Sequence, residues 1–246
     1  MSVATPPACS AARPRSVGFT AYSLLDDPRR SCDRENPVPL CSGPRYDLGG
    51  GLSVFSEQTV AMRILACADQ HGRPDRIARV RALITEIRPD VVVLPGDLTH
   101  AGTGSETLEL LALPLPVLAV PGNMDHPAEA ARIRTQGQLG GPDPVIINGV
   151  SFGGPDVTRS CDILVVHEPP RGILDAVPSG QHIGSTRIRD LVERLHPRVV
   201  LCGHVHESPG IERHGDTLVV NCTMGDGKTG GAAIELTASD ATARLL

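Results

Sequence analysis

Several residue types that mark particular classes of protein are scarce in this sequence of 246 residues. It contains no tryptophan, three phenylalanines and two tyrosines, and Lys228 is its single lysine. No apolar run approaches the roughly 18 residues that a membrane-spanning helix needs, so we expect no membrane partner. The formal net charge is −5, and this lack of a basic excess argues against long nucleic acids as partners. We interpret the excess of arginine over lysine as codon bias and not as a binding signal.

The signs of a secreted, disulfide-bonded protein are also missing. The seven cysteines cannot all pair within one chain, and none of them forms a CxxC motif. The first residues lack the continuous apolar segment and the cleavage site of a signal peptide. Cys67, Cys161 and Cys202 lie in or beside aliphatic runs, where a thiol behaves as a small buried hydrophobe. A reducing cytoplasm is therefore the expected location.

Residues 1–61 differ in composition from the rest of the chain. They hold four of the five aromatic residues, clusters of proline and arginine, and the run from Gly49 to Gly51. No helical or strand period persists there for more than a few residues. Two interpretations stay open, namely a disordered extension and an upstream start codon assigned in place of Met62. The folded domain is expected to be residues 62–246.

From Met62 onward, short aliphatic runs alternate with helical periods, which is typical of a layered α/β fold. We expect strands at 64–68, 91–94, 116–120, 145–152, 162–166 and 199–202. Helices are expected after Pro74, Ser105, Pro127 and Ser185, with the two serines as N-terminal caps. The segments 217–221 and 232–236 are expected to form β-hairpins that close a second sheet.

Five polar clusters each follow a predicted strand. They are Asp69-Gln70-His71, Gly96-Asp97, Gly122-Asn123-Met124-Asp125, His167 and Gly203-His204-Val205-His206. The spacings of 28 residues from Asp69 to Asp97 and 26 from Asp97 to Asn123 each match one βαβ crossover. Because the carboxyl ends of parallel strands meet at one edge of a sheet, we expect these clusters to converge there.

The chemistry of the clusters favours a divalent cation. Imidazole, carboxylate and amide groups suit hard to borderline metals, and no thiolate is present in any cluster. Seven such ligands exceed one tetrahedral site and suit two metals that share a carboxylate. His204 and His206 are two residues apart, so in an extended segment both rings would face one way and could serve one ion each.

Each cluster also has a simpler structural interpretation. Asp69 and Asp125 could cap the helices that follow them. Asp97 and Asn123 could be turn residues, and His167 could be a structural histidine at a strand end. The order of all five clusters, each placed after an apolar run, favours the ligand interpretation over these alternatives.

The ordered set resembles the calcineurin-like metallophosphoesterase superfamily, whose blocks read D-x-H, G-D, G-N-[H/C]-[D/E], a lone H and G-H-x-H. The match extends from about residue 63 to 222, and the segments 167–172 and 182–185 also resemble small prokaryotic members. This resemblance implies that residues 62–246 form a metallophosphoesterase domain. Its fold would be α/β, a four-layer α/β/β/α sandwich, and its activity that of a hydrolase acting on phosphoric esters.

The resemblance also implies a site. One metal would be held by Asp69, His71, Asp97 and His206, and the other by Asp97, Asn123, His167 and His204. Manganese is the first expectation, with iron, zinc and nickel as alternatives. Asp97 and Asn123 would act in catalysis, and Asn123 would also contact the substrate. The two cations would supply a hydroxide that attacks a phosphodiester or small phosphomonoester.

The substrate alternatives are a cyclic nucleotide, another nucleotide ester and a non-nucleotide phosphate, and a homo-oligomer is compatible with the sequence. One position departs from the family pattern, because Met124 stands where the family usually has the His that protonates the leaving group. His126 is the expected substitute acid, whereas His100 is interpreted as an exposed loop histidine. His182 is expected on a loop over the site, in contact with substrate. The missing acid would bias the enzyme toward esters with good leaving groups.

Two other kinds of function fit the sequence less well. A non-catalytic protein-interaction module on the same fold is the main alternative, because some relatives serve as assembly subunits after losing key ligands. All seven expected ligands are present here, which ranks that alternative second. The sequence lacks the HxHxDH run that is expected of a metallo-β-lactamase type of hydrolase.

Overall fold

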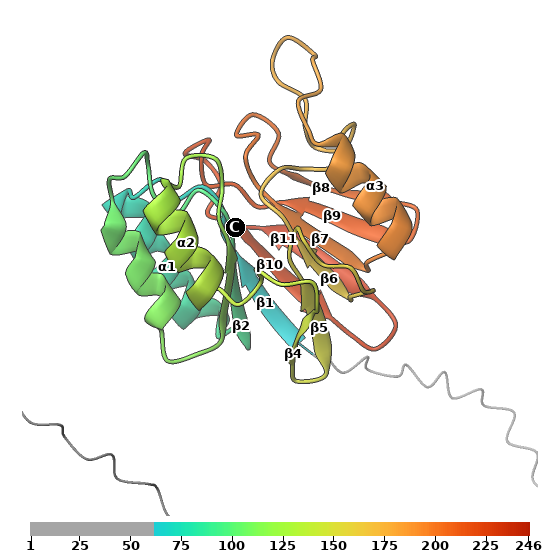
Figure 1. Cartoon of the computed structure of the whole chain (residues 1–246), viewed down its shortest axis with the longest axis horizontal. Coiled ribbons are helices and arrows are strands. Elements are labelled where there is room, and N and C mark those ends of the chain that lie inside the picture. Colours follow the sequence, from blue (N-terminus) through green and yellow to red (C-terminus); the bar gives the residue numbers. More distant parts are fainter. Residues whose placement is uncertain (1–61) are drawn as a thin grey trace, which may run out of the picture. The chain divides into compact units, whose positions relative to one another are not determined.

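The computed structural model describes residues 62–246, so the expectations for residues 1–61 lie outside the described part of the chain. Two β-sheets face each other, and helices cover their outer faces (Figure 1). The expected α/β/β/α sandwich is therefore confirmed. Within residues 62–246, no helix has the length and apolar character needed to cross a membrane.

The first sheet has the strand order β11-β10-β1-β2-β3. Its strands β1, β2 and β3 run parallel, while β10 pairs antiparallel with both β1 and β11. The bounds are β1 Met62–Ala66, β2 Val91–Pro95, β3 Val117–Val120, β10 Ala232–Leu236 and β11 Ala241–Leu245. Helix α1, Pro74–Ile87, connects β1 to β2, and the 3₁₀ helix η1, Ser105–Ala112, connects β2 to β3. Helix α2, Pro127–Gln136, follows β3 and leads to the second sheet.

The second sheet has the strand order β4-β5-β6-β7-β9-β8. Strands β5, β6, β7 and β9 are parallel, and β4 and β8 are antiparallel edge strands. The bounds are β4 Val145–Ile147, β5 Val150–Gly153, β6 Ile163–Val165, β7 Val199–Cys202, β8 Gly210–His214 and β9 Thr217–Asn221. Helix α3, Thr186–Leu195, connects β6 to β7.

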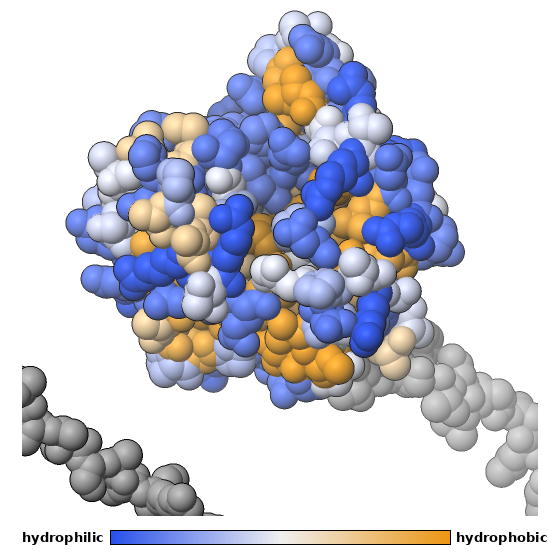
Figure 2. Space-filling view, viewed as in Figure 1, coloured by the Kyte–Doolittle hydropathy of each residue, from blue (hydrophilic) through white to orange (hydrophobic). Residues whose placement is uncertain are grey.

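Three apolar layers hold these elements together. The central layer lies between the sheets and includes Ile64, Phe152 and Leu201. A second layer packs α1 and η1 on the first sheet, and a third packs α3 on the second sheet. Strands buried on both faces read as continuous aliphatic runs, which is why the sequence predicts them well. The face seen in Figure 2 is mainly hydrophilic, with apolar patches along its lower margin, near β4 and β5, and smaller ones at the top and on the right.

Each of the segments 217–221 and 232–236 lies in an antiparallel hairpin, as expected, the first with β8 and the second with β11. Two other local expectations were wrong. Only the β8–β9 hairpin belongs to the second sheet, because 232–236 pairs with β1 in the first sheet. Ile234 and Leu236 reach the central apolar layer from this position, where β1 offers a free edge. The element after Gly104 is a 3₁₀ helix, and Gly104 occupies its N-cap in place of Ser105.

The carboxyl ends of the parallel strands of both sheets lie at a common edge of the sandwich. The loops after β1, β2 and β3 leave the first sheet there, and the loops after β6 and β7 leave the second. Backbone hydrogen bonds join neighbouring loops of each sheet, from Gly203 N to His167 O at 3.0 Å and from Asp69 N to Gly96 O at 3.0 Å. Between the sheets, Ala68 N donates to Cys222 O at 3.1 Å. The expected convergence of the five clusters is confirmed.

Candidate metal centre

Asp97 lies in the middle of the gathered polar clusters. It follows β2, is 2% exposed, and its backbone adopts the left-handed region with φ 53°. Its Oδ1 accepts a hydrogen bond from the Met124 N–H at 2.7 Å. Its Oδ2 lies 3.4 Å from His167 Nε2 and 3.9 Å from His71 Nε2. One oxygen of this carboxylate therefore faces histidines from both sheets.

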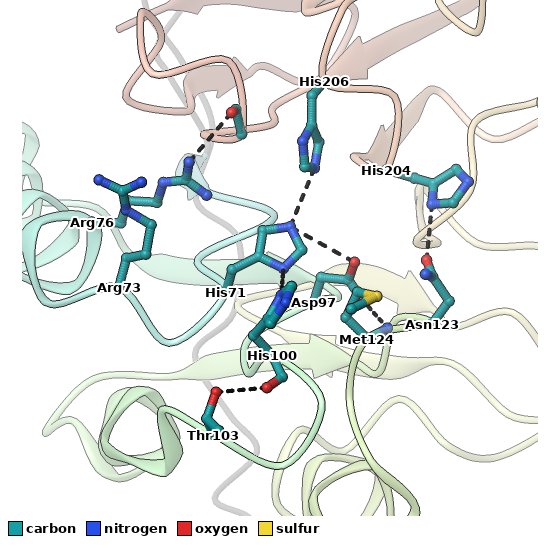
Figure 3. A pocket seen from close by; sticks show the side chains of 11 residues that line it. His71, Arg73, Arg76, Asp97, His100, Thr103, Asn123, Met124, His204 and His206 are labelled. Carbon is teal, nitrogen blue, oxygen red and sulfur yellow. Dashed lines mark hydrogen bonds and ion pairs between the residues drawn. The ribbon is translucent and has the colours of Figure 1, made fainter.

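A first group of ligand atoms forms on one side of Asp97. His71 Nε2 and His206 Nε2 face each other at 3.3 Å, and His206 Nε2 lies 3.5 Å from Asp69 Oδ1 (Figure 3). Atoms of Asp69, His71 and His206 all lie within 4.8 Å of one another. One carboxylate and two imidazoles so placed could hold a divalent cation.

A second group forms on the other side of Asp97. Asn123 Oδ1 lies 2.9 Å from both His167 Nε2 and His204 Nδ1, and these two ring nitrogens are 3.2 Å apart. Asp69, Asp97 and His167 also present oxygen and nitrogen atoms within 4.8 Å of one another. The structure thus brings together all seven residues expected as ligands.

The backbone orients His167 for this task. Its Nδ1 lies 2.9 Å from the Pro95 carbonyl oxygen, to which an Nδ1–H can donate. This contact leaves the Nε2 lone pair facing Asp97 and Asn123, an arrangement typical of metal-binding histidines. Burial lowers the pKa of His167, but the hydrogen bond to Asp97 and the negative charge of Asp69 outweigh it and raise the pKa to about 9. A cation bound here would replace that proton.

Asp69 is fully buried and anionic. Burial raises the pKa of its carboxyl, yet the hydrogen bond from His206 and the charge of His167 outweigh burial and hold the pKa below its usual value. The carboxylate also accepts the backbone N–H of His204 at 3.1 Å. It therefore links the loop after β1 to the loop after β7.

The segment that carries His204 and His206 is not extended, contrary to the expectation. His204 has φ 69°, and Val205 N donates to Gly203 O at 2.8 Å, so the chain turns between the two histidines. The rings consequently diverge, with His204 beside Asn123 and His206 beside His71 (Figure 3). Each ring faces a different group of ligand atoms, as the sequence interpretation required.

The cap interpretations of two aspartates are wrong. Asp125 accepts hydrogen bonds from Thr99 N and Thr99 Oγ1, both at 2.8 Å, and from Gly122 N at 2.9 Å. Helix α2 begins after His126, and α1 begins after Arg73, neither with a side-chain cap bond. Asp125 instead ties the loop after β2 to the loop after β3, on both sides of the Asp97 carboxylate.

A cavity of about 600 Å³ opens over the two groups of ligand atoms. His100 lines it, with Nδ1 3.5 Å from His71 Nδ1, whereas His126 does not and stands exposed at the N-cap of α2. The position of His126 thus gives no support for its role as the acid. Met124 lines the cavity, at the position where the resemblance places the family's usual acid.

His182 also lies away from this cavity. Its Nδ1 pairs with Asp175 Oδ1 at 2.5 Å. Asp175 is fully buried and accepts the N–H groups of Gly172 and Gly184, each at 2.9 Å. The contact places His182 in the framework of its own loop. Ser185 caps α3 by accepting the Ile188 N–H at 3.4 Å, which confirms its expected role.

Two arginines of the cavity wall were missed by the sequence interpretation. Arg73 and Arg76 line the cavity beside His71 (Figure 3). The Arg76 guanidinium donates to the backbone oxygens of Asp69 at 2.7 Å and Gly225 at 3.3 Å. Their signal in the sequence is their place at the start of the helix that follows the first polar cluster.

Comparisons with known proteins agree with this geometry. The sequence profile described as calcineurin-like phosphoesterase matches residues 62–208. An uncharacterized protein of Methanocaldococcus jannaschii is 29% identical over 195 residues, covering 65% of this chain and 87% of that protein. The human metallophosphoesterase domain-containing protein 1 is 37% identical over 70 residues, which are 28% of this chain and 22% of the human protein. The crystal structure of the phosphopantetheinyl hydrolase of Mycobacterium tuberculosis shares the fold, with TM-score 0.50, 15% identity, and coverage of 68% of this chain and 90% of that one.

Proposed function

This chain belongs to the calcineurin-like phosphoesterase family, and so to the hydrolases of phosphoric esters, and from this premise we propose that it cleaves phosphodiesters or small phosphomonoesters with two divalent cations bound. We assign one cation to Asp69, His71, Asp97 and His206, and the other to Asp97, Asn123, His167 and His204. The observation that supports this proposal is the pair of close nitrogen contacts, 3.3 Å between His71 and His206 and 3.2 Å between His167 and His204.

The donor set fits such cations. Carboxylate and amide oxygens together with imidazoles suit manganese, iron, zinc or nickel, and manganese is our first choice. Asp97 is placed between the two groups, so its carboxylate can serve both. The amide of Asn123 adds an oxygen without adding negative charge, which leaves the occupied site positive and attractive to phosphate.

When bound, the two cations supply an activated water and neutralise charge on the phosphate oxygens. The residues of this chain prepare the site for that chemistry. The Pro95 carbonyl sets the orientation of His167. The Met124 N–H binds Asp97 Oδ1, so the other carboxylate oxygen, Oδ2, faces His71 and His167. Arg73 and Arg76 add positive charge to the cavity wall, where it can draw in an anionic ester.

Leaving-group chemistry narrows the substrates we propose. The thioether of Met124 lines the cavity but cannot donate a proton. Esters whose leaving groups depart without protonation, such as aryl esters, are therefore the favoured substrates.

The test is hydrolysis of bis(p-nitrophenyl) phosphate by the full chain with added manganese. We expect turnover that a chelator abolishes and that Asp97→Asn reduces by at least ~10²-fold. Asp156→Asn is the matched control, because Asp156 is 63% exposed and pairs with Arg187 on the surface. Turnover that survives both the chelator and Asp97→Asn would contradict the proposal.

We also propose a cytoplasmic location. Within residues 62–246, Cys67, Cys161, Cys202 and Cys222 are free and buried. Burial raises the pKa of Cys67 to about 12, so this thiol stays protonated and unreactive. Unpaired thiols in a core are typical of proteins kept in a reducing compartment. Fractionation of cells that produce the protein tests this location.

A further inference from the structure

A second cavity adjoins the candidate metal centre. It measures about 400 Å³, and we call it the basic cavity after the four cationic side chains that line it, namely Arg73, Arg76, Arg79 and Lys228. Arg73 and Arg76 also line the cavity over the ligand atoms, so the two cavities share a wall. Figure 3 shows both arginines on the same side of His71.

The charges in the basic cavity do not cancel. Asp75 is its single acidic side chain, and it is already paired with Arg73 at 3.1 Å. In the described part of the chain, no ion pair within 4.0 Å involves Arg79 or Lys228. Even if Leu246, which also lines the cavity, contributes a carboxylate, positive charge exceeds negative charge there.

The loop between β9 and β10 fixes the far wall. Asp226 Oδ1 accepts the N–H groups of Lys228 and Thr229, each at 2.9 Å, and the Thr229 hydroxyl at 2.9 Å. The Asp226 carboxylate is thus used inside the loop and does not line the cavity. Gly230 lies against Arg79, where an added Cβ would be 2.9 Å from Nε. The loop that carries Lys228 therefore packs against Arg79, and both residues line the same cavity.

The chemistry of this lining selects a phosphate-like group. Guanidinium groups bind phosphate through parallel N–H donors, and a lysine ammonium adds a point charge. The cavity also lies at the first turn of α1, whose N-terminal end adds partial positive charge. Neither Arg79 nor Lys228 lines the cavity over the ligand atoms, so these two residues could act on a group that is not being cleaved.

We infer that the basic cavity binds a second phosphoryl group of the substrate, while the phosphoester to be cleaved lies over the metal centre. This inference rests on the proposed function and narrows it to esters that carry two phosphoryl groups within one small molecule. Arg73 and Arg76, on the shared wall, would lie between the two groups. Arg79 and Lys228 would contact only the second one.

The kinetic test compares two esters with the same leaving group. One is thymidine 5′-(p-nitrophenyl phosphate), and the other carries an additional 3′-phosphate. We expect kcat/KM to be at least ~10-fold higher for the doubly phosphorylated ester, through a lower KM. Arg79→Gln and Lys228→Gln should each reduce this ratio several-fold. Arg81→Gln is the control, because Arg81 pairs with Glu109 outside both cavities.

The ratio keeps the two proposals distinguishable. A ratio near one in the wild type, or a ratio that neither Arg79→Gln nor Lys228→Gln lowers, would overturn the second phosphoryl site while leaving the phosphoesterase intact. Absence of turnover on both esters would contradict the proposed function. Phosphate binding alone would then test whether the basic cavity is a phosphoryl site.

Lys228 offers that binding test, because it is the only lysine of the chain. We would acetylate the metal-loaded full chain with an N-hydroxysuccinimide ester and follow the peptide that contains Lys228 by mass spectrometry. Inorganic phosphate should slow this acetylation at least ~5-fold relative to chloride at equal ionic strength, and Arg79→Gln should remove the protection. Equal rates in phosphate and chloride would overturn the inference.

Discussion

Gly122 lies so close to Asp97 that a Cβ atom at position 122 would fall 2.1 Å from the Asp97 Oδ1 and 2.5 Å from its backbone nitrogen. The same short segment donates the Met124 N–H to that oxygen at 2.7 Å. The loop after β3 therefore wraps directly around the carboxylate that the loop after β2 supplies. Only a residue without a side chain permits this approach, which explains the glycine before Asn123.

Gly122→Ala should consequently push Asp97 out of place. We expect a loss of ~1–3 kcal/mol in the free energy of unfolding from overpacking, and a loss of at least ~10²-fold in kcat/KM from the displaced carboxylate. Gly141→Ala is the matched control, because nothing lies within 4 Å of a Cβ at Gly141. Urea unfolding and phosphodiester hydrolysis measure both effects, and equal behaviour of the two variants would contradict this account.

The fold and the meeting of the clusters could be predicted because both depend on features that are local in sequence. Aliphatic runs mark the buried parallel strands, and the crossover spacing from Asp69 to Asp97 brings their ends to one edge. The turn at His204 could not be predicted in this way, because its left-handed backbone depends on contacts with Asp69 from the other sheet. The role of Arg76 likewise depends on backbone oxygens of Asp69 and Gly225, which lie far apart in sequence.

Metal content tests the assignment of ligands to two ions. The wild type should retain two manganese ions per chain after dialysis. His206→Ala should retain one, because the group of Asp69, His71 and His206 loses one of its imidazole ligands. Asp97→Ala should lose most of both. Elemental analysis measures these numbers, and His214→Ala, on β8, is the control. At an ion concentration ~100 times Kd, each bound ion should add ~2.7 kcal/mol to wild-type stability, removable by chelator. Equal metal content in His206→Ala and the wild type would contradict the assignment.

Asp125 should matter for both stability and metal binding, although it is not a proposed ligand. Asp125→Asn places an amide N–H₂ where Thr99 and Gly122 present donors, so one hydrogen bond becomes a repulsive contact. We expect a loss of ~1–3 kcal/mol in the free energy of unfolding and weaker manganese binding. The control is Asp143→Asn, whose side chain is 65% exposed. A variant with wild-type stability and metal affinity would show that the bridge between the two loops is dispensable.

Met124 should limit the range of leaving groups. Met124→His restores a proton donor on the cavity wall, while the backbone N–H that binds Asp97 is kept. We expect kcat/KM on an alkyl phosphodiester to rise by at least ~10-fold, and little change on the p-nitrophenyl ester, which needs no acid. Met124→Leu controls for the loss of sulfur. An unchanged rate on the alkyl ester would exclude the missing acid as the limiting factor.

Asp175 should make the stability of the domain depend on acid. Burial raises the pKa of its carboxyl, but the N–H of Gly172, the imidazole of His182 and the N–H of Gly184 outweigh burial and lower it. The unfolded chain therefore takes up the proton at a higher pH than the folded chain. The stabilisation is complete above the ordinary carboxyl pKa of ~3.9 and is lost as the pH falls through the lowered value.

At pH 7, Asp175→Asn should lower the free energy of unfolding by ~1–3 kcal/mol, because a buried acceptor of three hydrogen bonds is weakened. The difference from the wild type should narrow toward pH 3, as measured by urea unfolding at both pH values. Asp216→Asn, at an exposed position, is the control, and a difference that stays constant from pH 7 to pH 3 would show that the charge of Asp175 contributes nothing to stability.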